Sequence, residues 1–200
     1  MDIVIKDLKL ESNNIFIAFI ISFLILAIFS FSFEEPFLPS IIWLAFIFSG
    51  TICIQSSFSE KEKLTALLLS PIPWFAIFLG KVFYAFILLL FIEGFTLLLS
   101  YVLFNFLFHT YQLFILIISS AFGFALSGAF ISAISLNAKN KLIYPILLLP
   151  ILFPILILSL SATNKILDGK MITLEFEALL LYIVLFLLLP YLLFEKLMRR

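Results

Sequence analysis

Apolar residues follow one another in long runs along this chain, and the charged residues are confined to short islands between the runs. A transmembrane helix needs about 20 consecutive apolar residues, so each run of roughly that length is a candidate span. The pattern predicts six transmembrane helices, at about residues 13–33, 37–58, 82–104, 113–137, 142–162 and 178–194. We therefore expect an all-α integral membrane protein with a single transmembrane domain over residues 1–200.

Composition supports this class of protein, because 64% of the residues are hydrophobic and the mean hydropathy is +1.29. A soluble domain of this length could not cover such a chain with polar surface, whereas membrane lipid can surround it. The formal net charge is zero, so the sequence does not indicate a nucleic-acid partner.

Basic residues predict the orientation, since cytoplasmic loops carry the excess of Lys and Arg. With the N-terminus inside, only Lys165 and Lys170 fall on the outer side. The other basic residues are then cytoplasmic: Lys6, Lys9, Lys61, Lys63, Lys81, Lys139, Lys141, Lys196, Arg199 and Arg200. We expect both termini in the cytoplasm. Residues 1–11 are typical of a short amphipathic helix along the membrane interface, with a disordered tail as the alternative.

The motifs of several enzyme classes are absent from the sequence. Gly80-Lys81 is followed by Val82 and has no glycine five residues earlier, so it is no P-loop for ATP phosphates. One histidine, His109, and one cysteine, Cys53, do not make a metal cluster. We expect a non-catalytic membrane subunit with no catalytic, cofactor-binding or metal-binding residues of its own.

The longest cytoplasmic connection, residues 59–81, carries the first candidate functional segment. Leu64, Leu67 and Leu68 share one face of a short helix over residues 60–70, which starts with Glu60 and Glu62 and is stopped by Pro71 and Pro73. A short amphipathic helix followed by a rigid turn suits docking in the groove of a cytoplasmic partner. The alternative is a helix that only anchors the loop on the membrane surface.

Two apolar runs carry special residue patterns. Ala121, Ala125, Ala129 and Ala133 repeat at intervals of four and predict a closely packed helix–helix seam, within the subunit or at a dimer interface. Pro145, Pro150 and Pro154 predict a bent or broken helix in the fifth span, which serves either a translocation route or plain packing.

Glu93 is the one formal charge inside a predicted span. A mid-membrane charge costs roughly 2.5–3.5 kcal/mol on insertion scales, so Glu93 is a candidate intramembrane polar site. Glu93 could serve a function, as a proton relay or in substrate contact. Alternatively its carboxyl forms a hydrogen bond across helices and has only a structural role, which is the interpretation we favour. His109, between the third and fourth spans, is interpreted as an interfacial side chain and not as a haem ligand.

Two stretches resemble a known family. The residues LxxLLLSPIP from Leu64 to Pro73, followed by LGK, are similar to the cytoplasmic loop of ABC-2-type permeases. The run FGFALSGAFISAISLNAKNKLIYPILLLPILFPILI, from Phe122 to Ile157, resembles haem exporter protein B (CcmB), the permease subunit of an ABC complex in cytochrome c maturation. Thr65 stands where ABC-2 permeases commonly carry an acidic residue, and Glu60 and Glu62 are candidates to substitute for it.

The resemblance implies a homodimeric permease in the bacterial inner membrane that binds ABC ATPase subunits through a coupling helix at residues 60–70. It implies that ATP binds only to the ATPase, and that haem is the cargo and not a cofactor bound to this chain. It also implies two further partners, a haem-handling membrane subunit and a periplasmic haem chaperone. The alternatives are an ABC-2 permease for a lipid, glycan or drug, a non-conducting assembly subunit, and a proton-coupled transporter.

Overall fold

The computed structural model describes residues 2–31, 37–57, 74–105, 110–135 and 143–198. These residues form the helices α1 (Asp2–Ser30), α2 (Leu38–Ser57), α4 (Trp74–Phe104), α5 (Tyr111–Ser135), α6 (Ile143–Leu167) and α7 (Thr173–Met198). Five of them contain apolar stretches long enough to cross a membrane, and α2 contains a shorter apolar stretch, Leu38–Ile54. The expectation of an all-α membrane protein is confirmed for the described residues.

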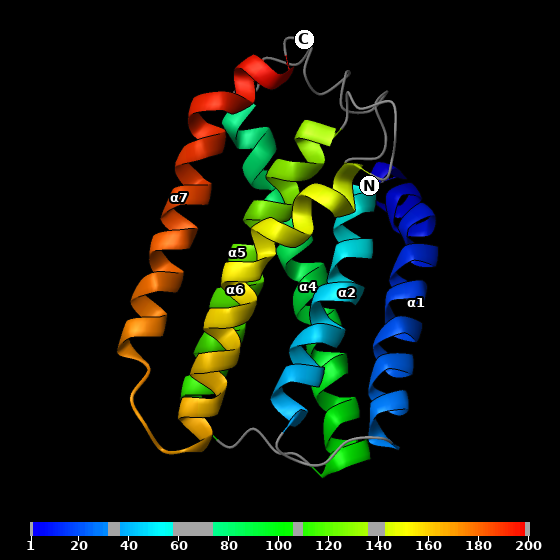
Figure 1. Cartoon of the computed structure of the whole chain (residues 1–200). Helices are drawn as coiled ribbons and strands as arrows, with labels where there is room; N and C mark the ends of the chain where they lie inside the picture. The colour runs from blue at the N-terminus through cyan, green and yellow to red at the C-terminus, as the bar shows by residue number, and fades with distance from the viewer. Residues whose placement is uncertain (1, 32–36, 58–73, 106–109, 136–142, 199–200) are drawn as a thin grey trace.

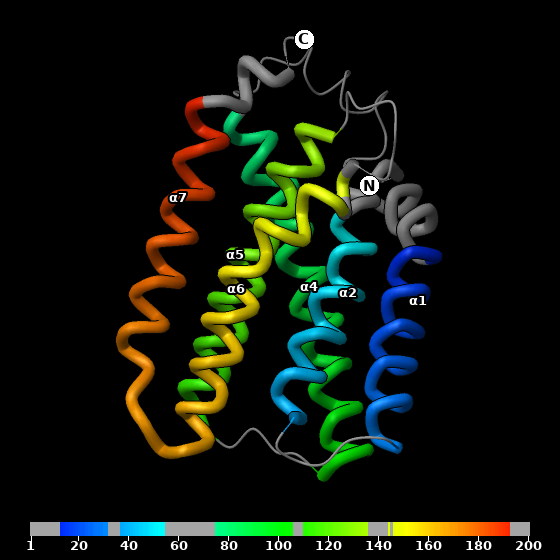
Figure 2. Tube along the Cα trace, in the orientation of Figure 1, coloured from blue at the N-terminus to red at the C-terminus, as the bar shows by residue number. Residues whose placement is uncertain are grey.

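Successive helices run in opposite directions along one bundle (Figure 1). The start of α1 and the end of α7 lie at one end of this bundle, which we call the inner end. The α6–α7 turn lies at the opposite end, which we call the outer end, and the same course can be followed along the trace in Figure 2.

Helix α5 is the centre of the bundle. It contacts α2, α4, α6 and α7, and 72% of its apolar stretch is buried, against 17–33% for the other four spanning stretches. Its small residues explain this position, because Ala, Gly and Ser let neighbouring helix backbones approach closely. The helices around α5 expose large apolar side chains on the outside of the bundle, among them Phe16, Phe91 and Leu181. A bilayer would cover these side chains.

The helix ends differ from the charge boundaries that the sequence suggested. Helix α1 runs without interruption from Asp2, so no break separates residues 2–11 from the first span. Helix α4 begins at Trp74 and therefore includes Lys81, and α7 begins at Thr173 and includes Glu175. A charged side chain near a membrane surface can pair or extend to the interface, so it does not end a helix.

Two turns at the outer end have clear local causes. Asn105 ends α4 with a positive φ of 54° and donates its backbone N–H to the Tyr101 carbonyl. Gly169 follows α6 with a φ of 71°, and the N–H groups of Gly169 and Lys170 bond to the carbonyls of Ile166 and Lys165. This is the Schellman pattern that ends many helices, and glycine adopts its left-handed conformation without strain. Helix α7 begins soon after this turn, at Thr173, and covers Leu174 and Phe176.

Candidate functional site

Most of the expected ATPase-coupling residues lie outside the described residues. These are Glu60, Glu62, Leu64, Leu67, Leu68, Pro71 and Pro73, and His109 lies outside them as well. Lys81 is described: it lies near the inner end of α4 and is partly exposed.

The alanine ladder of α5 is buried inside this chain. Ala121, Ala125 and Ala129 have no exposed surface, and Ala133 is 2% exposed. The glycines beside the ladder are equally enclosed. A Cβ added at Gly128 would lie 2.9 Å from two carbon atoms of Ile54 in α2, and one added at Gly123 would lie 3.4 Å from Ile155 in α6. The close approach of α5 to its neighbours therefore takes place within the subunit.

The prolines of α6 do not break the helix. Helix α6 is continuous from Ile143 to Leu167 with Pro150 and Pro154 inside it. Pro145 lies in the first turn, where a missing N–H removes no helix hydrogen bond. The ribbon of α6 bends along its first half, toward the inner end (Figure 1). Prolines within a helix cause such bends, because each removes one hydrogen bond and its ring presses on the carbonyl four residues earlier.

Glu93 lies in the middle of α4 and is 3% exposed. Its Oε2 atom is buried and has no hydrogen-bond partner. One turn further along, Thr96 lies 3.4 Å from the Ser22 hydroxyl of α1 and donates to the Ile92 carbonyl of its own helix. The Glu93 carboxyl is thus enclosed by the bundle, while one of its oxygens makes no bond to the protein.

Buried polar contacts join α6 to two neighbouring helices. The Trp43 indole N–H of α2 donates to the Thr163 hydroxyl at 3.0 Å, and the Ser120 hydroxyl of α5 lies 2.8 Å from that of Ser159. Ser159 and Thr163 are four residues apart, so both hydroxyls lie on one face of α6. They fix this face against α2 and α5.

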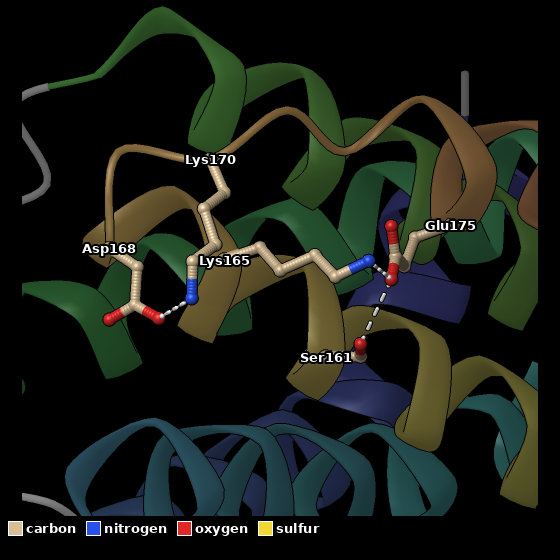
Figure 3. A network of polar contacts seen from close by, with 5 residues as sticks. All are labelled: Ser161, Lys165, Asp168, Lys170 and Glu175. Atoms are coloured by element: carbon tan, nitrogen blue, oxygen red, sulfur yellow. Dashed lines mark hydrogen bonds and ion pairs between the residues drawn. The ribbon is translucent and has the colours of Figure 1, made fainter.

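A second polar network joins α6 to α7 at the outer end (Figure 3). The Glu175 Oε1 atom lies 2.5 Å from the Lys165 ammonium and accepts a hydrogen bond of 3.0 Å from the Ser161 hydroxyl. The Glu175 side chain is 8% exposed and that of Lys165 is 40% exposed. A separate ion pair, Lys170 with Asp168 at 2.8 Å, is open to solvent on the turn (Figure 3).

A third contact joins the same two helices beside the α6 prolines. The Tyr182 hydroxyl of α7 donates to the backbone carbonyl of Ile151 at 3.0 Å. Ile151 lies between Pro150 and Pro154. The carbonyl of the adjacent residue, Pro150, has no helix N–H donor, because Pro154 lacks a backbone N–H. The Tyr182 bond thus lies one residue from the freed carbonyl of Pro150, not on it.

Sequence reasoning missed these contacts of α6, although part of their signal was present. The spacing of Ser159 and Thr163, and of Ser161 and Lys165, places each pair on one helix face. The partners Trp43, Ser120, Glu175 and Tyr182 come from three other helices, and no local pattern connects them to α6.

These features define a multi-pass α-helical membrane protein whose polar side chains join helices to one another. The chain matches the family model of the CcmB protein over residues 1–196 and belongs to that family. The resemblance found in the sequence is thereby confirmed, and the chain is a membrane permease component of a haem export system for cytochrome c biogenesis. No curated protein and no solved structure matches the chain.

Proposed function

We propose that this chain is the permease subunit of an ABC complex in the bacterial inner membrane, and that it helps to deliver haem for c-type cytochrome maturation. The observation that carries this proposal is the CcmB family match over residues 1–196, on a bundle of apolar helices. A haem-handling membrane subunit and a periplasmic haem chaperone are the proposed partners on the outer side. ATP is hydrolysed by a separate subunit, and this chain transmits the movement.

The proposed topology has six spans with both termini in the cytoplasm. Helix α2 has 20 residues, and a helix of that length extends for about 30 Å, which is the thickness of the hydrocarbon core. The excess of Lys and Arg in the segments expected to be cytoplasmic supports the orientation, and Lys81 of α4 lies near the inner end. Reporter fusions should place the C-terminus in the cytoplasm, and an external C-terminus would contradict the topology.

The proposed coupling segment is residues 60–70, with Pro71 and Pro73 after it and Lys81 near the start of α4. Closure of two ATPase subunits would push the two coupling segments of a dimeric permease and shift the attached helices. Leu64, Leu67 and Leu68 would form the docking face if the segment is helical, because they recur at helical spacing. Glu60 and Glu62 supply the acidic groups beside it.

Leu67→Asp tests this docking face, with Leu69→Asp as the matched control. Both variants add the same charge to the same segment, but residue 69 lies off the face that Leu64, Leu67 and Leu68 would share. Leu67→Asp should abolish co-purification of the ATPase, while Leu69→Asp should retain it at the same level of permease in the membrane. Undiminished co-purification of Leu67→Asp would exclude docking through this face.

A further inference from the structure

The polar contacts of α6 are unevenly distributed along its length. Among the described side chains, every hydrogen bond or ion pair that joins α6 to another helix lies at Ile151 or beyond. The α6 groups involved are the Ile151 carbonyl and the side chains of Ser159, Ser161, Thr163 and Lys165. Their partners come from α2, α5 and α7, so three neighbouring helices hold this part of α6.

Among the described side chains, the inner part of α6, before Ile151, is held to the bundle by apolar packing. Of its described side chains, Tyr144 and Leu148 are buried, while Ile146, Leu147 and Leu149 are exposed. The Tyr144 hydroxyl is buried and has no hydrogen-bond partner. Apolar packing is non-directional, so it allows small rotations and shifts that a set of hydrogen bonds would resist.

The boundary between the two parts coincides with the prolines. Pro150 and Pro154 each remove one backbone hydrogen bond of α6, and the helix bends in this region (Figure 1). The Tyr182 hydroxyl bonds to Ile151 between the two prolines. Among the described side chains, the first directional contact of α6 to another helix thus lies where prolines have removed backbone hydrogen bonds.

We propose that α6 works in two parts: residues 155–167 are fixed to the bundle, residues 143–150 pivot on the segment 150–154, and Tyr182 is the positioning residue that sets this pivot. In the proposed function, ATP binding by the partner subunit drives this pivot, and in that respect the pivot rests on the proposed function. Movement at the inner end then changes the bundle on the cytoplasmic side, while the outer end of α6 keeps its place.

Distances between nitroxide labels on the full chain in lipid nanodiscs test the pivot. Cys53 is replaced by Ala, and cysteines for labelling are placed at two pairs of exposed positions on α6 and α1. The inner pair is Ile146 with Phe16, and the outer pair is Asn164 with Ile28. The inner pair should give a broader distance distribution than the outer pair. Equal widths for the two pairs would overturn the proposal.

Tyr182→Phe, with Tyr191→Phe as control, tests the positioning role. Both variants remove one hydroxyl from α7, but Tyr191 is exposed and has no described bond to α6. Tyr182→Phe should change the inner-pair distribution and leave the outer pair unchanged, and Tyr191→Phe should change neither. An inner pair that does not respond to Tyr182→Phe would remove Tyr182 from the pivot.

The same labels separate this proposal from the proposed function. In the complex with the ATPase subunit, ATP should shift the inner-pair distance and leave the outer pair in place. A broad, Tyr182-dependent inner distribution that ATP does not shift would leave the pivot established and contradict ATP coupling. A shift of both pairs by the same amount would contradict the pivot and leave ATP coupling established.

Discussion

At the scale of single residues, burial decides how much each of the two outer ion pairs contributes. Glu175 is nearly buried between α6 and α7, and its second oxygen, Oε2, has no partner. The carboxyl therefore depends on Lys165 and Ser161, which both contact Oε1. Asp168 and Lys170 are both exposed on the turn, where water and salt screen their attraction.

Lys165→Gln should destabilise the protein more than Lys170→Gln does. The first change leaves a nearly buried carboxylate without its cation, and we expect a loss of about 1–3 kcal/mol, less than for a fully buried pair because Lys165 is partly exposed. The second change breaks an exposed pair worth about 0–1 kcal/mol. Thermal unfolding of both variants in the same lipid nanodiscs measures the difference, and equal effects would contradict the role given to Glu175.

Glu93→Gln tests whether the buried carboxyl of α4 has a function beyond packing. Glutamine keeps the size and polarity of the side chain but cannot ionise or carry a proton. The structural interpretation predicts unchanged protein levels in the membrane and unchanged holo-cytochrome levels. Loss of holo-cytochromes at an unchanged level of the variant would make Glu93 a functional group of the transport path.

At the scale of the helices, α5 is central because its small residues let four neighbours approach it. Gly128→Ala should therefore destabilise the fold. The added Cβ would meet Cδ1 and Cγ2 of Ile54 at 2.9 Å, and a β-branched side chain such as Ile54 has little rotamer freedom to move away. We expect a net loss of about 1–2 kcal/mol, since overpacking outweighs the better helix propensity of alanine.

Gly80→Ala is the matched control for this prediction. An added Cβ at Gly80 in α4 has no atom within 4 Å, so the change should be neutral or stabilising by up to about 1 kcal/mol. Thermal unfolding compares the two variants. A Gly128→Ala variant as stable as Gly80→Ala would show that the contact of α5 with α2 is looser than the structure has it.

Helix α6 shows what a sequence can and cannot predict for one element. The prolines predicted a bent or broken helix, and the structure has a continuous, bent one. The choice between bending and breaking depends on neighbouring helices, because they supply contacts such as the bond from Tyr182 to Ile151. Such partners are distant in the sequence, so no local pattern indicates them.

At the scale of the whole molecule, the uncharged runs were enough to predict an all-α membrane bundle, because an uninterrupted apolar run of about 20 residues matches a membrane-spanning helix. Helices α4 and α7 begin at Trp74 and Thr173, before the predicted spans 82–104 and 178–194, so the charged residues Lys81 and Glu177 that bounded those spans lie inside helices. The alanine ladder predicted a close seam, but its location inside one subunit required the structure. The burial of Glu93 also depends on the packing of several helices.

The described polar contacts of α6 are concentrated toward one end of the bundle. The outer end is fixed by the turn after α6 and by the bond network of Lys165, Ser161 and Glu175. The inner part of α6 is held by apolar packing alone among its described side chains. Under the proposed function, the ATPase moves the permease from the cytoplasmic side, at the end where the described side chains of α6 make the fewest directional contacts.

The central claim is that the chain serves haem delivery for c-type cytochromes, and one measurement tests it most directly. Haem staining of membrane and periplasmic c-type cytochromes is compared in a strain that lacks the gene and in the same strain with the gene restored, with immunoblots for the apoproteins. We expect the strain without the gene to lose the holo-cytochromes while it still makes the apoproteins. Restoring the gene should bring the holo-cytochromes back fully. Normal holo-cytochromes in a deletion strain without a second copy of the gene would contradict it.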